Sequence, residues 1–296
     1  MTVEIHLTSY TPRSTFVTAE SIVVSDEEAG VPDQNQDVLD RETAQRWIAR
    51  WEIQQQGYLP DREDRFTALI DAVEEAAGRR DPLVLDLGCG PGSLSVRLLD
   101  RMPAARIIAI DTDPVLLALG RTAYADRDGL RFADVDLRSD GWTGALGLDR
   151  PADAAVSTTA LHWLQPEALH VMYARLATVL RPGGLLLDGD HLKDDATAVP
   201  TLARLGQVLI EREEQRRFPD GLPESWQGWW EAIKEDPALA APVAQREQRR
   251  LTENHHGSES VQLATHVDGL RAAGFAEIGT LWQRGENRIL AGVLAP

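Results

Sequence analysis

The sequence predicts an α/β fold in which a doubly wound, mostly parallel sheet of seven strands carries helices on both faces. Short apolar runs alternate with amphipathic helical stretches between residues 83 and 190. Apolar runs of this length, buried on both faces and separated by helices, are typical of parallel sheets with right-handed crossovers. A mostly helical stretch, residues 196–257, breaks the alternation and predicts an inserted cap.

Five expected parallel strands form the first part of this pattern. Ahead of them, Phe66, Leu69, Ile70 and Val73 recur at helical spacing and predict an amphipathic helix that ends near Gly78. The strands are expected at residues 83–87, 106–110, 130–133, 153–157 and 185–188.

Proline and glycine mark the ends of the later elements. Pro166 suits the first position of a helix, and the run from Arg181 to Gly184 is expected to end that helix. A further helix over residues 261–273 is closed by Gly274. The last two strands, joined by a hairpin-like connection, are expected at residues 276–282 and 287–293.

The composition of the chain indicates which partners it can bind and in which compartment it is expected. The net charge of −17 disfavours a nucleic-acid substrate, because binding to phosphate backbones depends on cationic side chains. No apolar run approaches the roughly 18 residues of a membrane span, and the first ten residues lack a secretory signal. Cys89 is the single cysteine, so no internal disulfide is expected. We expect a cytoplasmic protein that binds no membrane, and the near absence of lysine is typical of high-GC bacteria.

A glycine-rich turn follows the first expected strand. Gly88, Gly90 and Gly92 let the backbone turn tightly and approach a ligand closely. The dinucleotide fingerprint G-x-G-x-x-G is absent because position 93 is serine. Asp86 lies just ahead of the turn, which suits a cationic sulfonium ligand better than a pyrophosphate.

Two further carboxylates close the next two strands. Asp111 stands where an acidic residue hydrogen-bonds ribose hydroxyls, and Asp134 stands where a carboxylate accepts from an adenine amino group. Ligands of open α/β sheets bind at the carboxyl ends of the strands, where all these acids are expected to lie.

With these motifs the sequence resembles the class I S-adenosylmethionine-dependent methyltransferase family. The matching segments are residues 84–92, 110–113, 134–135, 159–164 and 180–184. The resemblance implies a Rossmann-like methyltransferase fold and S-adenosyl-L-methionine as the cofactor. It implies cofactor binding by Asp86, Gly88, Cys89, Gly90, Asp111, Thr112, Asp134, Val135, Thr159 and His162.

The family also places helices ahead of the first strand, where they close over the cofactor. Tyr58 and Arg65 are candidates there, since an arginine suits the methionyl carboxylate. A surface position on an amphipathic helix is the alternative for Arg65. The expected organisation is then a flexible tail or lid (1–45), a cofactor-binding core (46–195), a cap that carries the acceptor site (196–257) and a return to the core (258–296).

Methyl transfer needs alignment of the acceptor, and a general base only where the acceptor must lose a proton. The candidate bases are His162, His191, His255 and His256, each with a structural role as the alternative, and the last three are the best placed. No metal is expected, because no group of residues has ligand spacing. The acceptor pocket is expected to include Trp163, Trp226, Trp229 and Trp230.

The sequence therefore predicts a methyltransferase that acts on a small organic molecule, with O-methylation favoured over N- or C-methylation. A protein or RNA methyltransferase and a non-catalytic S-adenosylmethionine-binding module remain alternatives. A nicotinamide oxidoreductase is disfavoured by the missing phosphate-binding spacing. The identity of the acceptor and the oligomeric state stay open.

Overall fold

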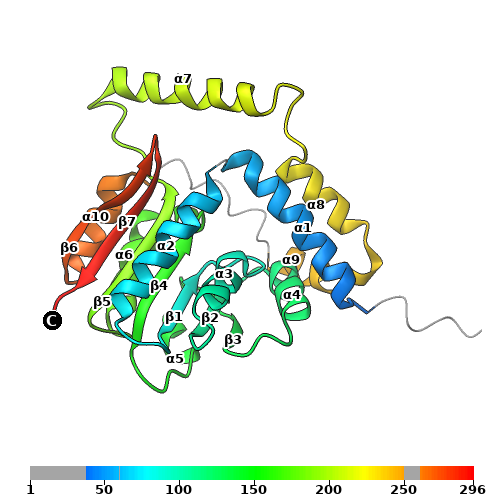
Figure 1. Cartoon of the computed structure of the whole chain (residues 1–296), viewed down its shortest axis with the longest axis horizontal. Helices are drawn as coiled ribbons and strands as arrows, with labels where there is room; N and C mark the ends of the chain where they lie inside the picture. Colours follow the sequence, from blue (N-terminus) through cyan, green and yellow to red (C-terminus); the bar gives the residue numbers. More distant parts are fainter. Residues whose placement is uncertain (1–37, 60, 250–260) are drawn as a thin grey trace, which may run out of the picture. The chain divides into compact units, whose positions relative to one another are not determined.

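The computed structural model of the chain describes residues 38–59, 61–249 and 261–296. Their sheet has seven strands in the order β3-β2-β1-β4-β5-β7-β6 (Figure 1). The first five are parallel, and β7 runs antiparallel to both β5 and β6. The strands are β1 (Leu83–Leu87), β2 (Arg106–Asp111), β3 (Leu130–Asp134), β4 (Ala152–Thr158), β5 (Leu180–His191), β6 (Phe275–Arg284) and β7 (Asn287–Leu294). This topology confirms the predicted fold class.

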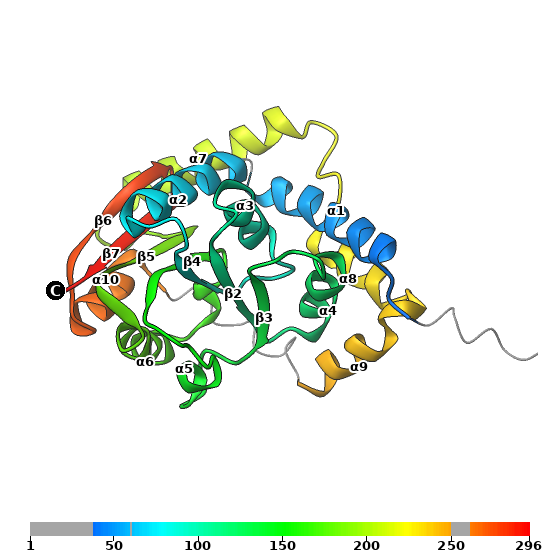
Figure 2. The same cartoon turned by 60° about the horizontal axis from the view of Figure 1, so that its bottom comes forward.

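Helices cover both faces of the sheet, as Figure 2 shows. The helices of the sheet are α2 (Arg62–Ala77), α3 (Ser93–Arg101) and α4 (Pro114–Ala123) on one face, and α5 (Trp142–Ala145), α6 (Pro166–Ala177) and α10 (Leu263–Ala272) on the other. Alternate strand residues feed the two cores: Leu85 and Ile108 pack toward α5 and α6, while Val84 and Ile107 pack toward α2 and α3. Both faces of β1 are therefore apolar, as in other parallel sheets.

The remaining helices form a separate layer beside the carboxyl ends of the strands. They are α1 (Arg41–Tyr58), α7 (Pro200–Arg217), α8 (Trp226–Lys234) and α9 (Ala240–Gln248), with short 3-10 turns at η1 (Leu161–Trp163) and η2 (Pro237–Leu239). Helices α1, α4 and α8 share a third apolar cluster. By contrast, α7 buries none of its residues.

Two predicted boundaries were wrong. The run from Arg181 to Gly184 opens β5 instead of ending α6, which already ends at Ala177. The chain bulges there: Ala152 pairs with Leu180, yet Ala154 pairs with Leu185. Gly183 has a φ of 68°, which glycine adopts without strain, so the Pro-Gly-Gly run fits inside a strand.

The expected tail also ends earlier than predicted. Helix α1 begins at Arg41, after Asp40, whose carboxylate accepts a hydrogen bond of 2.7 Å from the Thr43 amide. Such a cap satisfies one of the free N–H groups at the start of a helix. Residues 41–45 are therefore helical, and the rest of the proposed tail, up to residue 37, lies outside the described residues.

Trp229 is the centre of the contact between α1 and α8. Its side chain is fully buried, and its ring packs edge-on against Trp47 at 5.9 Å and against Trp51 at 5.0 Å. We expect Trp229→Ala to lower the free energy of unfolding by about 3–5 kcal/mol, because it removes a large buried side chain. Urea unfolding measures this loss.

Leu202→Ala is the control, since this side chain is 66% exposed on α7. An equal change in stability for both variants would contradict the proposed packing of α1 on α8.

Candidate active site

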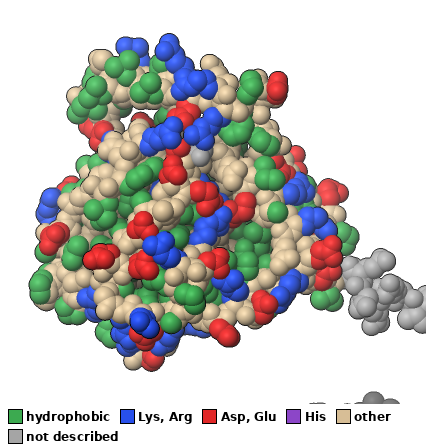
Figure 3. Space-filling model, in the orientation of Figure 1, with side chains coloured by type: hydrophobic (Ala, Val, Ile, Leu, Met, Phe, Trp, Pro, Cys, Tyr) green, Lys and Arg blue, Asp and Glu red, His purple; other side chains and the backbone are tan. Residues whose placement is uncertain are grey.

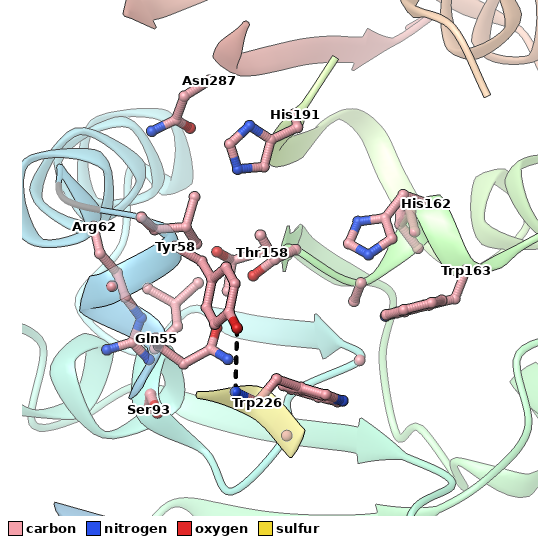
Figure 4. A pocket seen from close by; sticks show the side chains of 18 of the residues that line it. Gln55, Tyr58, Arg62, Ser93, Thr158, His162, Trp163, His191, Trp226 and Asn287 are labelled. Atoms are coloured by element: carbon pink, nitrogen blue, oxygen red, sulfur yellow. Dashed lines mark hydrogen bonds between the residues drawn. The ribbon is translucent and has the colours of Figure 1, made fainter. Parts of the chain in front are cut away.

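A cavity of about 1040 Å³ opens at the carboxyl ends of the parallel strands. Its walls come from α1, the glycine turn after β1, the ends of β2, β4 and β5, and helices α7 and α8 (Figure 4). This is the edge at which open α/β sheets bind their ligands. The cavity is large enough for two small molecules side by side.

The glycine turn forms the floor of this cavity. Gly88 and Gly90 have φ values of 69° and 56°, in the region that favours glycine. A side chain on Gly88 would lie 2.3 Å from the Cβ of Ala160, so the turn packs directly against the segment after β4. At Gly90 the nearest atom would be 3.8 Å away, on Trp51, and this position leaves the backbone open to a ligand.

Asp111 ties the turn to the end of β2. Its carboxylate accepts hydrogen bonds from the amides of Gly90 (2.8 Å), Thr112 (2.7 Å) and Asp113 (2.8 Å). Burial raises the pKa of Asp111 to about 6, with the charge of Asp113 adding to the effect and the amide hydrogen bonds opposing it. The ionised carboxylate is thus costly in this place, and donors from a ligand would stabilise it.

Asp86 lies behind the turn and does not line the cavity. It is fully buried and accepts a hydrogen bond of 2.6 Å from Ser95 at the start of α3. Burial raises its pKa to about 7. The structure therefore gives Asp86 a role in joining β1 to α3, where the sequence analysis expected a direct cofactor contact.

Asp134 is also displaced from the role expected of it. Its carboxylate pairs with Arg249 at 2.7 and 2.8 Å and does not line the cavity. Val135 and Asp136 line the cavity instead. Residues 134–136 read Asp-Val-Asp, so the sequence offered two acids for the adenine contact. The predicted one, Asp134, is the last residue of β3, and the chain reaches the cavity only after this strand has ended.

The segment after β4 supplies Thr159 and His162, both of which line the cavity as expected. Thr159 has a φ of 49°, a strained value for a β-branched residue, and its amide donates to the Gly189 carbonyl at 2.9 Å. This contact holds the segment across the end of β5. Cys89 and Thr112 line the cavity too. Burial, with the charges of Asp111 and Asp86, raises the pKa of the Cys89 thiol well above its usual value, so a nucleophilic role is disfavoured.

His162 forms a pair with a buried carboxylate. Its Nδ1 lies 2.8 Å from both oxygens of Asp190. The pKa of Asp190 is lowered to about 2: burial raises it, but His162 and Arg65 outweigh that effect. Because an ionised carboxylate only accepts, Nδ1 carries a proton and Nε2 remains the basic nitrogen. His162 was predicted as a cofactor contact, and its pairing with Asp190 could not be read from the sequence.

His191, a predicted base, lines the same cavity from the end of β5. Burial lowers its pKa; Asp190 opposes this shift, whereas Arg65 adds to it. Its imidazole is therefore a weaker base than an exposed histidine. The other predicted bases, His255 and His256, lie outside the described residues.

The two predicted residues ahead of β1 differ in their surroundings. Tyr58 lines the cavity, and its hydroxyl accepts a hydrogen bond of 3.2 Å from the Trp226 amide (Figure 4). Arg65 is fully buried and does not line the cavity; it donates to Asn287 at 2.8 Å and to Thr158 at 2.5 Å. Burial lowers the pKa of Arg65 to about 10. Neither predicted role for Arg65, methionyl contact or surface residue, matches this position.

The predicted aromatic pocket is partly correct. Trp163, Trp226 and Trp230 line the cavity, whereas Trp229 belongs to the core between α1 and α8. Trp51 of α1 also lines it. Within the described part of the chain, no group of three or more His, Cys, Asp or Glu side chains could hold a metal ion, and no helix is long and apolar enough to cross a membrane.

Comparison with known proteins identifies relatives of this domain. Residues 84–184 match the family described as "Methyltransferase domain". The trans-aconitate 2-methyltransferase of Streptomyces coelicolor is 34% identical over 147 residues, which cover 49% of this chain and 45% of that protein. The enzyme of the same name from Escherichia coli (strain ATCC 8739) is 35% identical over 129 residues, 44% of this chain and 47% of that protein. The chain thus spans about half the length of the curated relatives it matches.

Solved structures of similar topology have lower identity. An O-methyltransferase family protein from Burkholderia thailandensis is 18% identical, with a TM-score of 0.49 over 86% of this chain and 63% of that chain. Human N-acetylserotonin methyltransferase in complex with SAM is 16% identical, with a TM-score of 0.49 over 90% of this chain and 61% of that chain.

Asp111 generates a prediction about pH. Protonation removes acceptor capacity from its carboxylate, so a ligand that donates hydroxyl groups to it binds less tightly below its pKa of about 6. We expect affinity for S-adenosylmethionine to fall by up to about tenfold per pH unit below pH 6. Calorimetry between pH 5 and pH 8 measures this dependence.

Asp111→Asn is the matched variant, because it keeps the shape of the side chain and cannot ionise. It should bind more weakly at neutral pH and lose most of the dependence on pH. An unchanged profile in this variant would assign the effect to another group, such as Asp86.

Proposed function

Because this chain belongs to the class I S-adenosylmethionine-dependent methyltransferase family, we propose that it transfers a methyl group to an oxygen of a small organic molecule. The observation that carries this proposal is the continuity of one cavity, which runs from the glycine turn and Asp111 to the imidazole of His162 and the aromatic wall of α8. Cofactor and acceptor then meet in one enclosed space, as in-line transfer requires.

The residues present fit the cofactor of this family. Gly90 exposes its backbone to the cavity, and Asp111 offers acceptor oxygens suited to ribose hydroxyls. Trp51 and Tyr58 add aromatic faces, and aromatic rings attract a sulfonium cation. When bound, S-adenosylmethionine supplies the methyl group: the acceptor oxygen bonds the methyl carbon as the sulfur–carbon bond breaks and leaves its electron pair on sulfur.

For the adenine, we propose that Asp136 and the backbone of Val135 take the place expected of Asp134. Both line the cavity directly after β3. Hydrogen bonds from Arg138, at 2.8 Å from the Asp136 carboxylate, outweigh burial and lower its pKa, so it is an ionised acceptor at neutral pH.

His162 is the proposed general base for an acceptor that must lose a proton. Its Nε2 accepts the hydroxyl proton, and Asp190 stabilises the imidazolium that forms. The side chain is 22% exposed, which leaves it reachable from the cavity. His191 is the weaker candidate, because burial and the nearby Arg65 disfavour its charged form.

One alternative is distinguished by the absence of a product. A non-catalytic binding module would hold the cofactor without forming S-adenosylhomocysteine with any acceptor.

The relatives' name refers to trans-aconitate. Since those matches span about half of each protein, the acceptor of this chain is tested independently of that name.

The function is tested by two measurements on the full chain. Calorimetry should show micromolar binding of S-adenosylmethionine, about −8 kcal/mol, and no binding of NAD. Formation of S-adenosylhomocysteine should then depend on an oxygen acceptor in a panel of phenols, enols and carboxylic acids. Tight binding of NAD in place of S-adenosylmethionine would refute the proposed function.

With a hydroxyl acceptor from that panel, we expect His162→Ala to lower kcat by about 10²–10⁴-fold, because proton removal then has no partner. Cofactor affinity should change by no more than about threefold, or about 0.7 kcal/mol.

His191→Ala is the comparison, since this imidazole lines the same cavity without a carboxylate bonded to its ring. We expect a smaller loss of kcat. The reverse order of effects would move the general base to His191, one of the candidates that the sequence predicted.

A further inference from the structure

Helix α7 presents an apolar face to the cavity. Gly206, Leu209, Ile210 and Glu213 recur at the spacing of one helical face, and all four line the cavity. Leu209 is 64% exposed and Ile210 is 37% exposed, so the helix leaves apolar surface uncovered (Figure 3). An exposed apolar face of this kind marks a binding surface when it adjoins a cavity.

The C-terminal end of α7 is fixed in place by ion pairs. Asp61, at the start of α2, pairs with Arg217 at 3.0 Å and also with Arg284 in the β6–β7 hairpin. Glu213 pairs with the same two arginines, at 3.1 and 2.7 Å. This cluster holds the apolar face over the cavity, although α7 has no buried side chain of its own.

Another part of the cavity lining is aromatic. Trp226 and Trp230 of α8 line it, and their rings lie 5.8 Å apart. Trp163 and Phe218 add further aromatic surface. The part of the cavity that α7 and α8 line therefore has aliphatic side chains from α7 and indole rings from α8.

The cations that line the cavity are mostly neutralised by the chain itself. The pairs are Arg62 with Glu52, Arg138 with Asp136, Arg246 with Asp113, and Arg284 with Asp61 and Glu213. Among the residues that the structure describes, Lys193 and Arg216 are the lining cations without a carboxylate partner; Lys193 follows β5, and Arg216 lies near the end of α7. Glu214 and Glu286 line the cavity as well and add negative charge.

We propose that the acceptor is a molecule with an apolar, preferably aromatic, body and at most one negative charge, bound between α7 and α8. A tricarboxylate would have to leave water for a cavity in which, among the described lining residues, only Arg216 and Lys193 are cations without a carboxylate partner, and burying unpaired charge is costly. An apolar body instead covers Leu209 and Ile210 and stacks on the indoles. This inference rests on the proposed function and names its acceptor class.

The test uses 8-anilinonaphthalene-1-sulfonate, a fluorescent molecule with an aromatic body and one negative charge. It should bind the full chain with a stoichiometry of one, with and without S-adenosylhomocysteine. The matched variants are Leu209→Glu and Leu202→Glu: both leucines lie on α7 with nearly equal exposure, 64% and 66%, but only Leu209 lines the cavity. We expect Leu209→Glu to weaken dye binding by about tenfold or more, a loss of 1.4 kcal/mol or more, and Leu202→Glu to leave it unchanged.

Competition distinguishes the acceptor classes. We expect 2-naphthoate to displace the dye, and trans-aconitate and benzene-1,3,5-tricarboxylate to leave it bound. Displacement by the tricarboxylates, or methylation of trans-aconitate, would overturn the inference. Equal effects of the two leucine variants would do the same, and so would a monomer–dimer shift caused by Leu209→Glu, which would assign the face to a second copy of the chain.

These outcomes are separate from those that test the proposed function. Dye binding needs no cofactor, so absence of heat with S-adenosylmethionine would refute the methyltransferase and leave the apolar site in place. Methylation of a tricarboxylate would keep the methyltransferase and refute the acceptor class.

Discussion

The buried guanidinium of Arg65 is the interaction on which the site depends. It reaches from α2 over Gly189, where a side chain would lie 3.1 Å from it, and it bonds to Thr158 and Asn287 at the ends of β4 and β7. Its charge also stabilises the ionised form of Asp190, which in turn holds His162. Loss of this cation would leave buried negative charge without compensation, a change that costs several kcal/mol in other proteins.

The pKa values of two acids in β5, Asp188 and Asp190, are shifted in opposite directions because their surroundings differ. Asp190 has His162 beside it and a pKa of about 2, whereas burial, with Asp190 nearby, raises the pKa of Asp188 well above its usual value. The neighbour of Asp188 is His266, at 3.3 Å, whose own pKa burial lowers to about 4. A neutral imidazole does little to stabilise an anion, so the two positions suit one charged and one uncharged carboxyl group.

The sequence predicted the elements that local patterns determine and missed those that depend on tertiary contacts. Apolar runs and the glycine turn located the parallel strands and the floor of the cavity, because strand burial and positive φ leave a direct mark on residue type. The choice between Asp134 and Asp136 depended on where β3 ends, and strand ends are poorly specified by pattern. The burial of Arg65 and Trp229 depends on partners 93 or more residues away in the chain, which no local window contains.

The indoles of α1 and α8 form a continuous cluster, with Trp51 between Trp226 at 5.4 Å and Trp229 at 5.0 Å. Chromophores of one kind held this close in fixed, tilted orientations couple their electronic transitions. The cluster should therefore contribute strongly to the near-ultraviolet circular dichroism signal of the protein. Because Trp51 and Trp226 also line the cavity, a ligand that binds there should change this signal, so binding can be followed on the unlabelled protein.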